Sequence, residues 1–350
     1  MRSVLLEIIP RFMKTINPIF LSLFIIMILA SFISSSGDEK DVQKVNFYQK
    51  SLHATNKGIE FIYSKENGGI ERLVGKSAQD IGCIKSICHA TTCDDCHLKE
   101  FETRKSYSSD SVTINNACKK CHGDLAKDNS DVHFAKGMKC MNCHTSKEIH
   151  GDGTENNTYM YPGFFDVKCE NCHKSISEIK SHTVHGNKLD CQACHTDEYS
   201  TCLNCHIDNR LKNSKEVQVL LKNMTFLINH NGKVTIGNML SYVYQGRTMI
   251  TFAKNYPHSI KKQGRKCLEC HKTRIIREIQ ENKFKLVWWE KDSLRNAEGV
   301  VPVLDGYDWN LVYLDQQNGK WIPFKNPPKP LLNYSGYCNP ITRQQFDKLR

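Results

Sequence analysis

Length, composition and charge exclude several classes of protein at the outset. The chain has 350 residues, enough for a sizeable core, yet only 39% are apolar and that share includes seventeen cysteines. We therefore expect something besides aliphatic side chains to fill the interior. The net charge of +11 comes without a basic block and with acidic residues interspersed, so it does not indicate a protein that binds nucleic acid.

The first 36 residues are typical of an export segment. Basic residues precede an apolar stretch from Ile19 to Ile33, which is followed by small residues. This stretch falls short of the roughly 20 residues that span a bilayer, so residues 1–36 are predicted to be either a cleaved signal peptide or an N-terminal membrane anchor. In both cases we expect the remainder to be extracytoplasmic, in the periplasm or on the outer face of the cytoplasmic membrane.

Cysteine is concentrated between Cys83 and Cys270, and only Cys338 lies outside. Seven times the chain repeats Cys-x-x-Cys-His, and an eighth copy has four residues between its cysteines. Two thiols at this spacing add to the vinyl groups of a porphyrin while the next imidazole binds the iron, so each copy predicts one c-type haem. The predicted attachment cysteines are Cys83, Cys88, Cys93, Cys96, Cys118, Cys121, Cys140, Cys143, Cys169, Cys172, Cys191, Cys194, Cys202, Cys205, Cys267 and Cys270. The predicted iron ligands are His89, His97, His122, His144, His173, His195, His206 and His271.

Zinc and disulfide bonds are the competing interpretations of paired cysteines. Zinc ribbons also use Cys-x-x-Cys, and an oxidising compartment favours disulfides. Neither explains why histidine follows the second cysteine in every copy. For the irregular copy one alternative remains, a disulfide between Cys83 and Cys88. We therefore expect eight haems, and seven if that disulfide forms.

The remaining histidines are candidates for the opposite side of each iron, because a low-spin electron-transfer haem needs two axial ligands. Three of them, His133, His185 and His258, lie shortly before a motif, too near to reach across the haem that follows, and should bind a neighbouring haem. Eight irons against seven candidates leave one iron without a second histidine, and Met, Lys, Cys338 or an open position could take its place. The seven candidates are His53, His133, His150, His182, His185, His230 and His258.

Regular secondary structure is expected mainly after the clustered motifs. Alternating β-prone residues and turn signals predict small β-hairpins near 231–253 and 284–323. The fold class is therefore predicted as α+β with little regular structure, in which short helices and loops wrap around a haem array. We expect a multihaem domain over 37–275 and a haem-free Trp/Pro-rich region over 276–350 that packs on it.

The motifs from Cys83 to His271 resemble those of the multihaem c-type cytochromes, and their number resembles the octahaem group. The resemblance implies either a carrier that relays electrons in a respiratory chain or an oxidoreductase of the tetrathionate, nitrite or hydroxylamine type. Two differences from known families argue against particular enzyme activities. The chain has no Cys-x-x-Cys-Lys motif as in the pentahaem nitrite reductases, and no widely spaced cysteine pair as in the octahaem sulfite reductases.

We therefore expect an electron carrier with redox protein partners rather than a substrate-converting enzyme, and no catalytic residue is assigned. A retained N-terminal anchor would bring it to membrane quinol or to a quinol-oxidising complex. The alternative is an octahaem oxidoreductase that uses the one haem lacking a distal histidine.

Overall fold

The computed structural model describes residues 47–55, 57–82, 90, 92–101, 104–123, 131–197, 199–213, 218–317 and 320–350. The predicted export segment and the irregular motif at Cys83 to His89 lie outside these residues. No helix within the described ranges is both long and apolar enough to cross a membrane.

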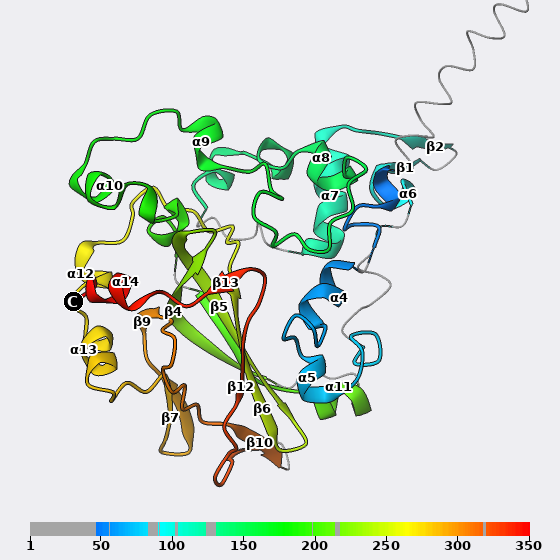
Figure 1. Cartoon of the computed structure of the whole chain (residues 1–350). Coiled ribbons are helices and arrows are strands. Elements are labelled where there is room, and N and C mark those ends of the chain that lie inside the picture. Colours follow the sequence, from blue (N-terminus) through cyan, green and yellow to red (C-terminus); the bar gives the residue numbers. More distant parts are fainter. Residues whose placement is uncertain are drawn as a thin grey trace, which may run out of the picture.

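A seven-stranded mixed sheet forms the centre of the molecule (Figure 1). Its spatial order is β12-β6-β5-β3-β4-β13, and β9 also pairs with β4. The pairs β12–β6, β3–β5 and β4–β9 are parallel, and the others are antiparallel. The strands are β3 Tyr199–His206, β4 Val219–His230, β5 Lys233–Tyr244, β6 Arg247–Lys254, β9 Gly299–Pro302, β12 Leu331–Tyr334 and β13 Cys338–Asn339.

Two tight turns set the register of the three longest strands. Asn231 and Gly232 join β4 to β5, and Gln245 and Gly246 join β5 to β6. All four residues have positive φ, between 49° and 75°. Two successive residues of positive φ form the hairpin turn whose twist matches that of the flanking strands. The hairpin predicted near 231–253 is therefore confirmed, as the middle of a larger sheet.

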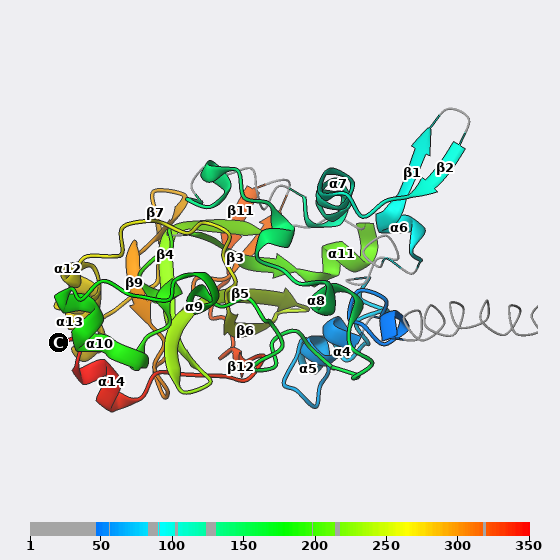
Figure 2. The same cartoon turned by 90° about the horizontal axis from the view of Figure 1, so that it is seen from above.

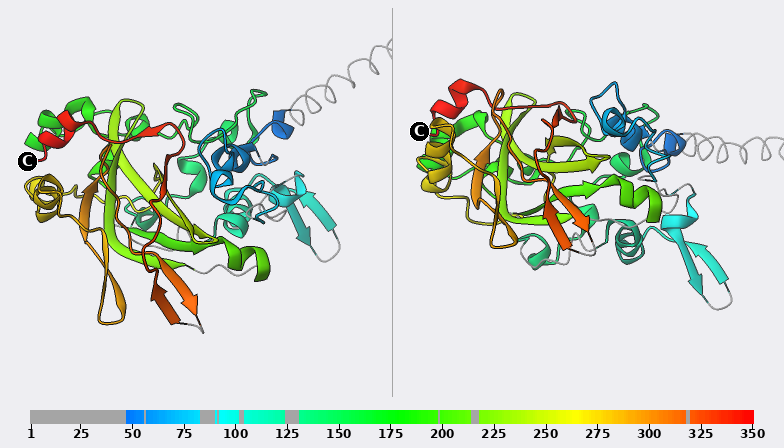
Figure 3. Two further views of the ribbon diagram at one scale, coloured as in Figure 1. Left: turned by 60° about the horizontal axis from the view of Figure 1, so that its bottom comes forward. Right: turned by 90° about the horizontal axis from the view of Figure 1, so that it is seen from below.

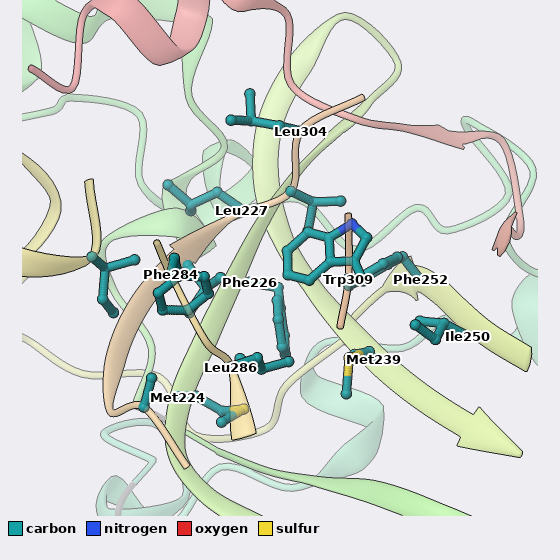
Figure 4. Packing of buried hydrophobic residues seen from close by; sticks show 14 of the residues in the cluster. Met224, Phe226, Leu227, Met239, Ile250, Phe252, Phe284, Leu286, Leu304 and Trp309 are labelled. Atoms are coloured by element: carbon teal, nitrogen blue, oxygen red, sulfur yellow. The ribbon is translucent and has the colours of Figure 1, made fainter. Parts of the chain in front are cut away.

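A conventional hydrophobic core covers one side of this sheet (Figure 4). Phe226 of β4 and Phe252 of β6 are fully buried, with ring centroids 5.6 Å apart. Trp309, from the C-terminal region, packs on Phe252 at 5.1 Å. The expectation that something besides aliphatic side chains fills the interior is wrong for this half, because β4 to β6 and the C-terminal region supply apolar side chains to one another.

The remaining strands form three small two-stranded hairpins, and the helices are short. The α+β class with short helices and small hairpins, including those predicted within 284–323, is confirmed. The hairpins pair β1 Leu98–Phe101 with β2 Arg104–Tyr107, β7 Val287–Glu290 with β8 Ser293–Asn296, and β10 Leu314–Gln317 with β11 Lys320–Pro323. The helices outside the motifs are α4 Lys57–Tyr63, α5 Glu71–Val74, α8 Ser146–His150, α10 Lys180–His185, α11 Ile207–Asn213, α13 Arg274–Gln280 and α14 Arg343–Asp347, with short 3-10 turns at η2 Phe134–Lys136 and η4 Gly186–Lys188.

Helices that carry or flank the motifs lie along one side of the sheet in chain order. In Figure 1 they run from right to left above the sheet and end beside it, from α6 (Asp94–His97) through α7 (Ser111–His122), α8, α9 (Cys169–Cys172) and α10 to α12 (Cys267–Cys270), and the view from above in Figure 2 keeps this order. The hairpin β10–β11 lies below the sheet in Figure 1, as the turned views in Figure 3 also show. The row of motifs and the C-terminal hairpins thus lie on different sides of the sheet.

Candidate haem sites

Six of the seven described motifs fold as a single helical turn. In an α-helix residues i, i+3 and i+4 share one face, so Cys-x-x-Cys-His turns two thiols and an imidazole in the same direction. The turn is closed by the histidine N–H, which donates to the carbonyl of the first cysteine at 2.8–3.0 Å in five motifs. The sixth lies within a longer helix. The turns are α6 Asp94–His97, α7 Ser111–His122, η3 Cys140–Asn142, α9 Cys169–Cys172, η5 Cys191–Ala193 and α12 Cys267–Cys270.

Each of these six motif histidines faces one of the other candidate histidines. The ring centroids of the six pairs lie 5.9–6.2 Å apart. Two metal–nitrogen bonds of about 2 Å, plus the distance from each ring centre to its nitrogen, come to about 6 Å. The spacing therefore fits one iron between each pair. The pairs are His97 with His150, His122 with His53, His144 with His258, His173 with His133, His195 with His182, and His271 with His185.

Several pairs join a motif to a histidine that precedes a different motif. His133 lies just before Cys140 but faces His173, and His185 lies just before Cys191 but faces His271. Chain segments far apart in sequence are brought together where His144 faces His258 and where His185 faces His271.

Seven of these twelve imidazoles form a hydrogen bond through Nδ1, which leaves Nε2 available. His97 Nδ1 donates to the Ser108 carbonyl at 3.0 Å, and His271 Nδ1 donates to the Lys348 carbonyl at 2.8 Å. Such a bond fixes the tautomer and the ring orientation of a metal-binding histidine. The carbonyls of Ser177, Ser181 and Lys261 accept in the same way from His182, His185 and His195.

His144 donates from Nδ1 to a carboxylate instead, Glu148 Oε2, at 2.9 Å, and His133 Nδ1 lies 3.3 Å from the carboxylate of Asp131. Glu148 is buried and also accepts from the backbone N–H groups of Thr145, at 3.2 Å, and Val167, at 3.1 Å. Its position four residues after His144, on the same helical face, is the signal by which sequence could have identified it. Sequence reasoning missed this residue because it searched only for ligands to iron.

Burial and neighbouring imidazoles affect the ionisation of the histidines that face the motifs. Burial lowers the pKa of His53, and the nearby His122 lowers it further. The same two causes lower the pKa of His150, beside His97, and that of His258, beside His144. These imidazoles are therefore held neutral, the form in which nitrogen binds a metal.

Successive motifs lie close enough for their thiols to affect one another. Burial, followed by the charge of Cys140, raises the pKa of Cys118 to about 11. The neighbouring thiols run in chain order: Cys96 with Cys121, Cys118 with Cys140, Cys143 with Cys172, Cys169 with Cys191, and Cys194 with both Cys267 and Cys270. The six turns therefore form one continuous row, which passes from the motif of Cys194 directly to that of Cys267.

Two predicted iron ligands stand apart from the pairs. His206 and His230 are both buried, and each uses Nε2 to donate to a carbonyl, that of Leu314 at 2.7 Å and that of Met160 at 3.1 Å. Neither ring faces another imidazole in the part of the chain that the structure describes. Cys338 is buried and lies directly opposite His230 in the pairing of β13 with β4.

The comparisons with known proteins agree with this chemistry. Residues 92–174 match the family described as cytochrome c554 and c-prime. The matched stretch contains four of the six helical-turn motifs, and it supports a multihaem c-type cytochrome that binds haem c, with a role in electron transfer or as an oxidoreductase. No curated protein and no solved structure matches the chain.

Proposed function

We propose that this protein relays electrons along a row of c-type haems outside the cytoplasmic membrane. The observation that carries the proposal is the set of six facing imidazole pairs, each beside the two cysteines of one helical-turn motif. Each such motif would attach one haem, with its own histidine on one side of the iron and the facing histidine on the other. Irons with two protein ligands have no position for a substrate, which favours a carrier over an oxidoreductase.

The bound haem supplies a one-electron iron couple, and the protein sets its potential through ligands, hydrogen bonds and burial. Backbone carbonyls accept from the Nδ1 atoms of five of the imidazoles, whereas Glu148 accepts from that of His144. A buried negative charge next to an axial imidazole stabilises the oxidised iron. The haem of His144 should therefore have a lower potential than an otherwise similar haem whose imidazole donates to a carbonyl.

The row of motifs supports electron movement in a fixed spatial order. Because the thiols of successive motifs are neighbours, haems bound there would follow one another in the order of the motifs, and electrons would pass between the motif of Cys93 and that of Cys267. Seven of the paired imidazoles are already held by a hydrogen bond through Nδ1, so electron transfer would not require these side chains to move. Partners would be redox proteins that meet the two ends of the row, or membrane quinol at a retained N-terminal anchor.

Spectroscopy of the purified holoprotein with a pair of matched variants tests the proposal. His185→Ala removes a histidine that faces a motif histidine, so one low-spin haem should become high-spin and bind CO. His230→Ala removes a candidate that faces no motif histidine among the described residues and whose Nε2 donates to the Met160 carbonyl, and should leave the number of low-spin haems unchanged. Electron paramagnetic resonance and CO difference spectra report both outcomes.

Three results would count against the proposal. Equal spectral effects of the two variants would show that the pairs do not mark iron ligands. A wild-type haem at one of the six motifs that is high-spin and binds CO or nitrite would favour the oxidoreductase. Failure of the protein to be reduced and reoxidised rapidly by protein or quinol donors would remove the carrier role.

A further inference from the structure

The motif Cys202 to His206 is the exception among the described motifs. It lies in β3, a central strand with β5 on one side and β4 on the other. Its backbone is extended, so it lacks the closed turn that the other six share. The motif contains both cysteines and the histidine, but it lacks the helical turn that would place them on one side.

The strand separates the thiols from the imidazole. Cys202 pairs with Leu240, and Cys205 with Tyr242, so the two cysteines are on one face of the sheet. This happens because Asn204, with φ of 58°, forms a bulge that adds one residue. His206 pairs with Val243, the next residue along β5, and its side chain is therefore on the other face.

The two faces are both packed. Cys205 contacts the buried cluster that contains Ile70, Ile207 and Tyr242, whereas Val243 belongs to the main core on the opposite face. A haem joined to both cysteines would be separated by the sheet from the imidazole that should bind its iron. The residues of this motif therefore do not fit the group that the sequence assigns to them.

His206 makes different contacts that account for its burial. Its Nε2 donates to the Leu314 carbonyl at 2.7 Å, and Asn204 Nδ2, on the same face, donates to the Val312 carbonyl at 3.3 Å. The indole of Trp321, in β11, lies 5.6 Å from the His206 ring. Two side chains of the motif thus fasten the segment that leads into hairpin β10–β11.

We propose that the Cys202–His206 motif holds no haem in the folded protein and that His206 is instead a clamp between the sheet and the C-terminal hairpin. The inference takes from the proposed function only the assignment of haem to the six paired motifs.

Peptide mass mapping of the holoprotein, produced with a c-type haem attachment system, tests it directly. The peptide with Cys202 and Cys205 should carry no haem and react with a thiol reagent after unfolding, whereas the peptide with Cys191 and Cys194 should carry one haem. A haem on the first peptide overturns the inference and leaves the proposed function standing. Absence of haem from both would instead remove the proposed function.

Matched variants separate a clamp from an iron ligand. His206→Gln retains an N–H donor for the Leu314 carbonyl, so it should keep the low-spin haem spectrum and nearly the wild-type thermal midpoint. His206→Leu should keep the spectrum but lower the midpoint, because the carbonyl loses its partner. His195→Gln, in the neighbouring motif, should remove one low-spin signal. Loss of such a signal in either His206 variant would overturn the inference.

Discussion

The row of motifs and the central sheet are held together in different ways. In the row, the cysteines and most motif histidines are half-buried or exposed, and the described buried residues are few and often polar, such as Asn115, Asp131 and Glu148. In the sheet, Phe226, Phe252 and their neighbours form a continuous apolar cluster. One half thus has a core of its own, and the other is arranged around pairs of imidazoles. We therefore expect the cofactors to stabilise the row of motifs and not the sheet.

Removal of haem should produce the largest difference in stability between the row of motifs and the sheet. In protein made without haem attachment, the amides of α7, α8 and α10 should exchange nearly as fast as in an unfolded chain, because those segments bury little apolar surface. The amides of β4, β5 and β6 should keep protection equivalent to about 5 kcal/mol or more. Hydrogen exchange followed by mass spectrometry measures both regions in one sample. Equal loss of protection in both would show that the sheet also depends on haem.

Truncation of the apolar core should have the next largest effect, and it should destabilise the sheet rather than the row of motifs. Phe252→Ala should lower the free energy of unfolding of the sheet by about 3–5 kcal/mol, because the fully buried ring leaves a cavity. Leu220→Ala, in β4 of the same sheet but 53% exposed, should change it by about 0.5 kcal/mol or less. Denaturant unfolding followed by tryptophan fluorescence gives both values, and similar costs would contradict the assignment of this core.

Neutralising Glu148 should have a smaller effect, confined to one haem. Glu148→Gln replaces an acceptor of several hydrogen bonds with a side chain that must also bury an N–H₂ group, at a cost of about 1–3 kcal/mol. It should also raise the potential of the haem held by His144, because a negative charge beside the imidazole is lost. Redox titration of individual haem signals tests this. Glu155→Gln, at an exposed carboxylate paired with Lys57, is the control and should leave all potentials unchanged.

The smallest effect should be a pH dependence of sheet stability through His230. Burial lowers the pKa of His230, the nearby Lys254 lowers it further, and the Met160 carbonyl and Asp190 oppose this. As pH falls below the unfolded value of about 6.5, the unfolded chain gains a proton that the folded chain does not. Stability should therefore decline below that pH, and less so in His230→Gln. Unfolding midpoints from pH 8 to pH 5 measure the difference, and identical profiles would contradict it.

Much of the site could be predicted because its chemistry is local. The spacing of Cys, Cys and His at i, i+3 and i+4 specifies a group that one helical turn brings together without help from the rest of the chain. The tight turns at Asn231–Gly232 and Gln245–Gly246 are local in the same way, since two successive residues determine them. The mixed class and the hairpin at 231–253 followed from these signals.

The tertiary structure decided what depends on distant segments. Which histidine faces His173 or His271 cannot be deduced from spacing, because the partners come from loops that approach only when the chain is folded. The motif at Cys202 to His206 has the same residue types as the others, yet it is extended because β5 pairs with it from Cys202 to His206, β4 pairs with its first two residues, and the C-terminal segment offers a carbonyl to His206. A short motif supplies the right residue types, but the segments that pair with its backbone determine whether those residues can bind one cofactor.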